Sequence, residues 1–97
     1  MIDDILSEAE QIAAQASPDD AARFLASYRK EACEALENTP SAIADLLAIT
    51  SAQMQFLIDA GASDKALGIA EWFLHTLHHF EETIDHGDFI RIGRAHV

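Results

Sequence analysis

Apolar residues recur at alternating steps of three and four along most of this chain, which is the period of amphipathic α-helices. Three short segments interrupt the pattern with residues that are typical of helix ends and turns: Ser17-Pro18-Asp19-Asp20, Asn38-Thr39-Pro40 and Gly61-Ala62-Ser63-Asp64. Between them the pattern predicts four helices, over residues 2–16, 18–37, 40–60 and 64–86.

Each interruption carries residues that can end one helix and begin the next. Ser17 is expected to be an N-cap residue, since its hydroxyl can accept from the first free backbone N–H groups. At the second interruption, we expect Asn38 to end a helix in a left-handed conformation and Thr39 to cap the following one. At the third, Gly61 is expected to end a helix and Ser63 to cap the last one.

Connections of only a few residues favour antiparallel packing of consecutive helices. We therefore predict an all-α fold, a small up-and-down antiparallel bundle of about four helices, over residues 1–87. Residues 88–97 form a short irregular C-terminal tail in this interpretation. The third helix is apolar on two sides and is expected to be central. The fourth helix has one apolar stripe expected to face the core: Ala66, Ala70, Phe73, Leu77, Phe80 and Ile84.

The composition supports helices and limits the partners. The chain has 97 residues, enough for one core, and its large apolar residues are mainly Ile, Leu and Phe rather than the β-branched Val. The formal net charge of −11 argues against direct nucleic-acid binding, which requires a basic face, and is compatible with a protein partner that carries a basic surface.

A single cysteine, Cys33, excludes an internal disulfide and favours a reducing compartment. Asp3 and Asp4 stand where a secretory signal would carry basic residues, and no apolar run is long enough to span a membrane. The expected location is the cytoplasm, without membrane association. Glu31, Glu34 and Glu37 near Cys33 should raise the pKa of its thiol, which favours a packing role over a nucleophilic one.

Histidines and carboxylates gather on the fourth helix, and histidine and glutamate at helical spacing can ligate a metal ion. The spacings nevertheless miss the helical zinc and di-iron patterns by one residue, and no other predicted helix contains a histidine. We therefore predict no metal site and no cofactor. The low-ranked ligand candidates are His75, His78, His79 and Glu82.

No catalytic constellation is recognisable in the chain. It has no glycine-rich phosphate loop, no nucleotide fingerprint and no Ser–His–Asp arrangement. A chain of this size also leaves little room for a sizeable cleft. We therefore expect no catalytic residues and no enzyme activity.

Two segments are candidates for binding another protein or a second copy of the chain in a homodimer. On the fourth helix, Trp72 follows Gly68 by one turn, so a missing side chain and a large indole lie side by side, and Ile69 extends the same edge. In the tail, apolar residues alternate with basic ones and could pair with a partner in an extended conformation. The tail candidates are Phe89, Ile90 and Ile92. In the alternative for each segment, Trp72 packs against the first or second helix of the same bundle, and Phe89 or Ile92 folds back to cover a bundle end.

The sequence thus favours a non-enzymatic, acidic helical protein that acts through protein–protein interaction, as an adaptor, a small chaperone or an inhibitor of another protein. Two alternatives remain open at this point. One is a metal-binding protein that uses the His/Glu stripe. The other is an acidic nucleic-acid mimic that occupies a DNA- or RNA-binding protein.

Overall fold

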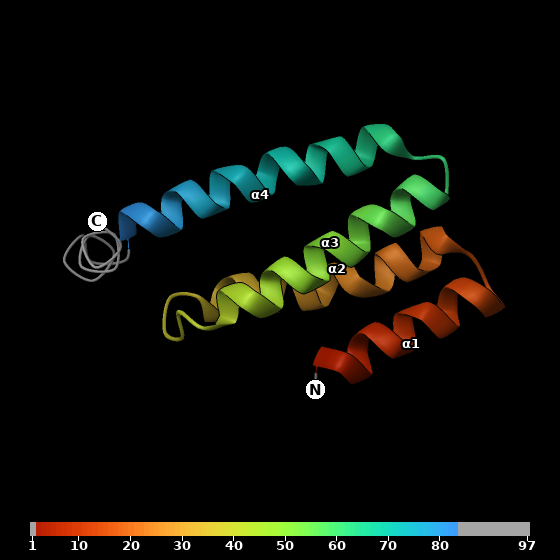
Figure 1. The fold of residues 1–97 in the computed structure, drawn as a ribbon, viewed down its shortest axis with the longest axis horizontal. Helices are drawn as coiled ribbons and strands as arrows, with labels where there is room; N and C mark the ends of the chain where they lie inside the picture. Colours follow the sequence, from red (N-terminus) through yellow and green to blue (C-terminus); the bar gives the residue numbers. More distant parts are fainter. Residues whose placement is uncertain (1, 84–97) are drawn as a thin grey trace, which may run out of the picture.

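The computed structural model describes the backbone of residues 2–83 and the side chains of residues 2–80, and within that range it is all-α. Consecutive helices run antiparallel, so the predicted four-helix fold is confirmed (Figure 1). The helices are α1 (Ile2–Gln15), α2 (Pro18–Ala35), α3 (Ala42–Asp59) and α4 (Ser63–Thr83).

The start of α2 is as predicted. Ser17 has extended backbone angles, and its Oγ accepts a hydrogen bond of 3.1 Å from the backbone N–H of Asp20. Pro18 occupies the first turn, where its missing N–H would have had no partner in the helix. These contacts fix the short turn between α1 and α2.

The connection between α2 and α3 differs from the prediction. α2 ends at Ala35, and no residue other than glycine has a positive φ in the described range, so Asn38 does not adopt the left-handed conformation. Instead, the backbone N–H of Asn38 donates to the carbonyl of Ala35 in a tighter turn. Thr39 lies before a further turn, and Ser41 directly precedes α3 without a side-chain cap. Hydrogen bonds within these turns therefore satisfy backbone groups for which the sequence predicted capping side chains.

Gly61 ends α3 as predicted. Its φ of 77° lies in the left-handed region, and the backbone N–H of Ala62 donates to the carbonyl of Leu57 while that of Gly61 donates to Ile58. These two bonds form a Schellman motif. The predicted cap at Ser63 is wrong, because α4 already begins at Ser63 and Ala62 occupies the preceding position.

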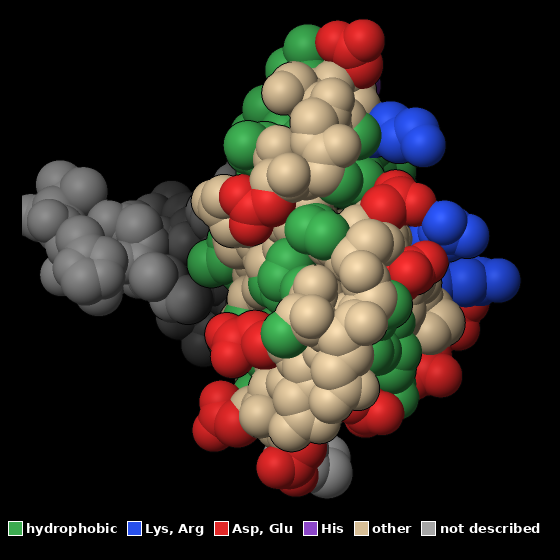
Figure 2. Space-filling model, turned by 90° about the vertical axis from the view of Figure 1, so that its right-hand side faces the viewer, with side chains coloured by type: hydrophobic (Ala, Val, Ile, Leu, Met, Phe, Trp, Pro, Cys, Tyr) green, Lys and Arg blue, Asp and Glu red, His purple; other side chains and the backbone are tan. Residues whose placement is uncertain are grey.

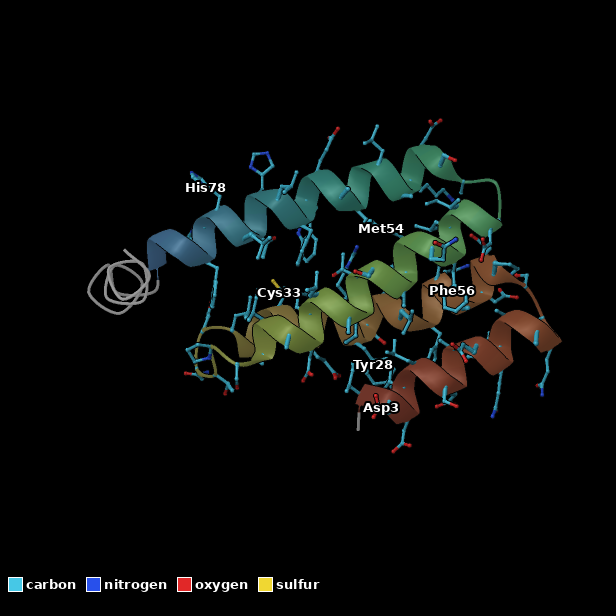
Figure 3. The ribbon with its side chains drawn as sticks, viewed as in Figure 1. Asp3, Tyr28, Cys33, Met54, Phe56 and His78 are labelled. Carbon is cyan, nitrogen blue, oxygen red and sulfur yellow. The ribbon has the colours of Figure 1, made fainter. Side chains whose placement is uncertain are left out.

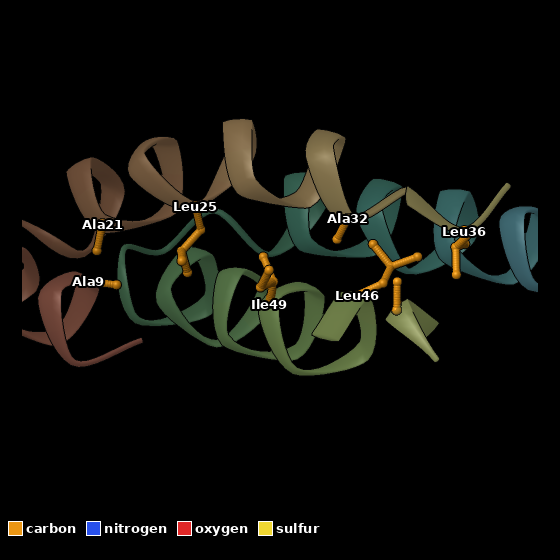
Figure 4. Close-up of a cluster of buried hydrophobic side chains, with 8 residues drawn as sticks. Ala9, Ala21, Leu25, Ala32, Leu36, Leu46 and Ile49 are labelled. Carbon is orange, nitrogen blue, oxygen red and sulfur yellow. The ribbon is translucent and has the colours of Figure 1, made fainter. Parts of the chain in front are cut away.

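The main core lies where α1, α2 and α3 meet, and most of its apolar contact is between α2 and α3 (Figure 4). Leu25 and Leu46 are fully buried there, and Ile49 is nearly so. Helix α3 packs against all three other helices, as expected from its two apolar sides. The small residues Ala9, Ala21 and Ala32 allow the helices to approach closely.

Helix α4 packs along α3 on the side away from α1 (Figure 1). Ala66 is the one buried member of its predicted core stripe within the described side chains, and it lies in a small second cluster with Ala22 and Leu57. Phe73 and Phe80 are half-buried against the main core, and Ile84 lies outside the described residues. No helix in the described range combines the length and the apolar character that crossing a bilayer requires.

Two glycine substitutions are expected to change stability in opposite directions. Gly61→Ala should lower the free energy of unfolding by about 1 kcal/mol, because an alanine at φ 77° is strained although nothing lies within 4 Å of its Cβ. Gly68→Ala should raise it by up to about 1 kcal/mol, because Gly68 lies within α4 with equally open surroundings. Urea unfolding followed by circular dichroism measures both, and shifts of the same sign would contradict the assignment.

A candidate protein-binding groove

Three adjoining depressions run between α2 and α4, and we call them together the α2–α4 groove. Their volumes are about 440, 370 and 370 Å³. The first and second share Ala26, and the second and third share Cys33, so the three follow one another along α2. The lining residues of α4 follow the same order, from Lys65 through Trp72 to Phe80, because α2 and α4 both run antiparallel to α3.

Small side chains keep the groove open. On α2 the lining includes Ala22, Ala26 and Cys33, spaced by four and seven residues on one helix face. On α4 it includes Gly68, where an added Cβ would meet no atom within 4 Å. No Cα of α2 lies within 8 Å of a Cα of α4, so the two backbones are separated along their whole length.

Helix α3 forms the floor of the groove at its first depression, through Gln53 and Leu57. Both side chains are 5% exposed. The Nε2 of Gln53 donates a hydrogen bond of 3.1 Å to the carbonyl of Ala22, which ties α2 to α3 at this point. Its Oε1 is buried and has no hydrogen-bond partner among the described residues. The floor is thus mostly apolar with one unsatisfied acceptor.

Trp72 and Arg29 meet across the middle of the groove. The Arg29 guanidinium carbon lies 4.7 Å from the centre of the indole ring, a cation–π contact that links α2 and α4. One guanidinium nitrogen, Nη1, is buried without an acceptor, and burial lowers the pKa of Arg29. Arginine stays charged despite such a shift, so the groove contains a partly desolvated cation that lacks a carboxylate.

Every lysine and arginine in residues 2–83 lines this groove. Figure 2 shows the basic side chains visible from one end of the molecule along a single edge. Arg23 is paired within its own helix, with its Nη2 donating to Asp19 Oδ2 at 2.7 Å, and this bond lowers the pKa of Asp19. The four cations are Arg23, Arg29, Lys30 and Lys65.

Cys33 lies at the junction of the second and third depressions and is half-buried. Figure 3 shows its side chain on α2. Burial raises the pKa of its thiol; Glu34 and Glu37 raise it further, and Arg29 opposes them. The predicted direction is confirmed, although burial rather than the acidic neighbours is the main cause.

The three interaction residues predicted on α4 all line this groove: Gly68 and Ile69 at its first depression and Trp72 at its second. The sequence argument missed the residues that face them from α2. Arg23, Ala26 and Lys30 recur at steps of three and four in an otherwise acidic chain, and that pattern was a usable signal. The tail candidates lie outside the described residues: Phe89, Ile90 and Ile92.

The histidines of α4 are divided between two sides of the helix. His75 and His78 line a shallow depression with Glu71 and Leu74, and Figure 3 shows His78 projecting outward from α4. His79 lines the third depression of the groove instead. In the part of the chain whose side chains are placed, no three His, Cys, Asp or Glu residues gather as a metal site would need, and the side chain of Glu82 lies outside that part.

A scan against protein-family models finds no match to the chain, and searches of curated proteins and of solved structures find none either. The function of the protein is therefore inferred from the geometry and the charges of the α2–α4 groove.

Cys33 is expected to react slowly with iodoacetamide in the folded protein. Its thiol pKa is raised, so a smaller fraction is thiolate at neutral pH, and the rate should keep rising at a pH where that of the urea-unfolded chain has levelled off. Arg29→Gln removes the opposing cation and should shift the profile further toward alkaline pH. Arg23→Gln is the matched control, because Arg23 does not contribute to the shift. Identical pH–rate profiles for folded and unfolded protein would contradict the raised pKa.

Proposed function

We propose that this protein is a non-enzymatic binding protein, which receives a helix of another protein in the α2–α4 groove. The proposal is supported by one observation: the groove is continuous between α2 and α4, which run parallel and both pack against α3. Adaptors, small chaperones and inhibitors of other proteins all act in this way. The single cysteine is compatible with a reducing location, such as the cytoplasm.

The dimensions of the groove suit a helix. On α2 it extends from Asp19 to Leu36, which is about 26 Å at the rise of an α-helix. Helices α2, α3 and α4 surround the position that a further helix would take in a bundle, and amphipathic helices commonly bind in such grooves. An incoming helix would cover the half-buried side chains of Ile69 and Trp72, because Ala22 and Leu57 are already buried.

The centre of the groove has the composition of an anchor region. Trp and Arg are the residue types that most often dominate binding energy when they lie near the middle of an interface. Trp72 is half-buried, and its carbonyl also accepts a 2.9 Å hydrogen bond from the Thr76 hydroxyl. Arg29 is held against its ring. The pair is therefore partly ordered before a partner arrives, which lowers the entropic cost of binding.

The two alternatives from the sequence gain no specific support. The histidines on the described part of α4 face two directions, and acidic side chains occur on all four helices rather than in one array. The metal-binding and nucleic-acid-mimic interpretations therefore stay predictions, and helix binding is the function that we put forward.

Gly68→Phe is expected to block partner binding without unfolding the protein. The added ring would enter the groove at a position where a Cβ meets nothing, and removing glycine from a helix favours folding. Tagged full-length protein would be purified from its native cells, and co-purifying proteins would be quantified by mass spectrometry. We expect recovery of the specific partner to fall about tenfold, as for a loss of 1.4 kcal/mol of binding energy.

Leu67→Phe is the matched control. It places the same side chain one residue away, at a leucine that is 61% exposed and does not line the groove. This variant should recover the partner as the unsubstituted protein does. If Gly68→Phe and Leu67→Phe recover the same proteins in the same amounts while both remain folded by circular dichroism, the proposed function is wrong.

A further inference from the structure

We infer that the helix received by the α2–α4 groove is acidic and amphipathic, with carboxylates that face Arg29, Lys30 and Lys65. This inference rests on the proposed function and adds the chemistry of the partner. It runs against the expectation from the net charge of −11, which favours a partner with a basic surface.

The basic residues of the described chain are concentrated in the groove. Residues 2–83 contain four lysines and arginines, and all of them line the groove. Three carboxylate residues also line it, and Asp20 pairs with Arg23 beside it, so the groove is close to neutral within a strongly negative protein. Because charges more than about 8 Å away are largely screened at physiological ionic strength, an occupant in the groove responds mainly to this lining.

Most of these cations form no ion pair with a carboxylate of the described residues. Among the described residues, Arg23 forms ion pairs with Asp19 and Asp20, whereas Arg29, Lys30 and Lys65 form none. Arg29 is half-buried over Trp72, and because its Nη1 is buried, an occupant could reach only its other guanidinium N–H groups. A guanidinium binds a carboxylate through two parallel hydrogen bonds, so a carboxylate from the occupant is the natural partner for Arg29.

The order of charges along the groove bears on the orientation of the helix. The four cations, together with Asp19, line the groove from its first depression to Lys30, which lies beyond the middle of α2, whereas Glu34 and Glu37 line the remaining, second part. An occupant that carries carboxylates along its whole length would meet repulsion at the second part. The acidic residues of the helix should therefore be concentrated in the part that extends from Lys65 to Arg29.

The chain contains two natural reporters for a test. Trp72 and Cys33 are the single tryptophan and the single cysteine of the protein, and both line the groove. Binding in the groove should therefore change the fluorescence of Trp72 and slow the labelling of Cys33. Binding elsewhere on the surface should leave both unchanged.

The probes are three synthetic amphipathic helices of about 18 residues, the length that spans the groove. They share one apolar face and differ at the flanking positions of one end, which are Glu, Gln or Lys. We expect the Glu peptide to shift Trp72 emission and protect Cys33, with an affinity about tenfold higher than that of the Gln peptide. The Lys peptide should give no change at either reporter.

Two double variants of equal net charge distinguish the effect of the groove cations from the effect of the protein's total charge. Arg29→Gln with Lys30→Gln removes two groove cations and should reduce the affinity for the Glu peptide about tenfold. Gln11→Glu with Ser51→Glu changes the net charge by the same amount at exposed positions outside the groove, and should leave that affinity nearly unchanged.

Three results would overturn the inference. The Lys peptide could bind at the two reporters as well as the Glu peptide, or none of the three peptides could bind. Alternatively, Cys33 labelling could slow with rising protein concentration as the protein self-associates, in which case the occupant is a second copy. The first two results leave the proposed function standing if Gly68→Phe still abolishes partner recovery, so the two failures can be distinguished.

Discussion

The packing of α2 and α4 against the same helix, α3, is the interaction on which the other features of this molecule depend. Helix α3 carries apolar residues on two sides, so it can bury Leu46 and Ile49 against α1 and α2 while Leu57 contacts α4. Because α2 and α4 both contact α3, they run parallel, and their backbones stay apart. Small residues at Ala22, Ala26 and Gly68 then leave the space between them unfilled. The groove therefore exists because α2 and α4 both pack against α3 and not against each other.

The same arrangement leaves α4 less well buried than α2 and α3. Its one fully buried side chain in the described range is Ala66, whereas Leu67 and Leu74 are more than half exposed. Most helical stability in proteins comes from tertiary packing, so α4 depends on its contacts with α3 and on the Arg29–Trp72 contact with α2. A helix bound in the groove would contact α2 and α4 together and would stabilise the position of α4. Binding and the stability of α4 are thus coupled in the proposed function, as binding to the folded state always stabilises it.

The sequence predicted the parts of the fold that local chemistry decides. The cap at Ser17 and the glycine end at Gly61 each depend on a few neighbouring atoms, and both were predicted correctly. Asn38 was predicted wrongly because a left-handed end and a tight right-handed turn satisfy similar backbone groups, and residue preference alone does not choose between them. On α4, the spacing of Gly68 and Trp72 was enough to indicate an edge. The cations that face this edge come from α2, and their place depends on the rotation of one helix relative to another, which no pattern within one helix specifies.

The net charge of the protein and the cations of the groove should affect different steps of binding. An acidic helix that approaches this protein meets long-range repulsion from a net charge of −11, and repulsion of this kind mainly slows association. Close contact in the groove brings its carboxylates to Arg29, Lys30 and Lys65, and such contacts mainly slow dissociation. Salt therefore acts on the two steps in opposite directions, since it screens the repulsion and also weakens the contacts. On the rest of residues 2–83 an acidic helix meets no lysine or arginine, so the acidic surface there would favour specificity by disfavouring other modes of binding.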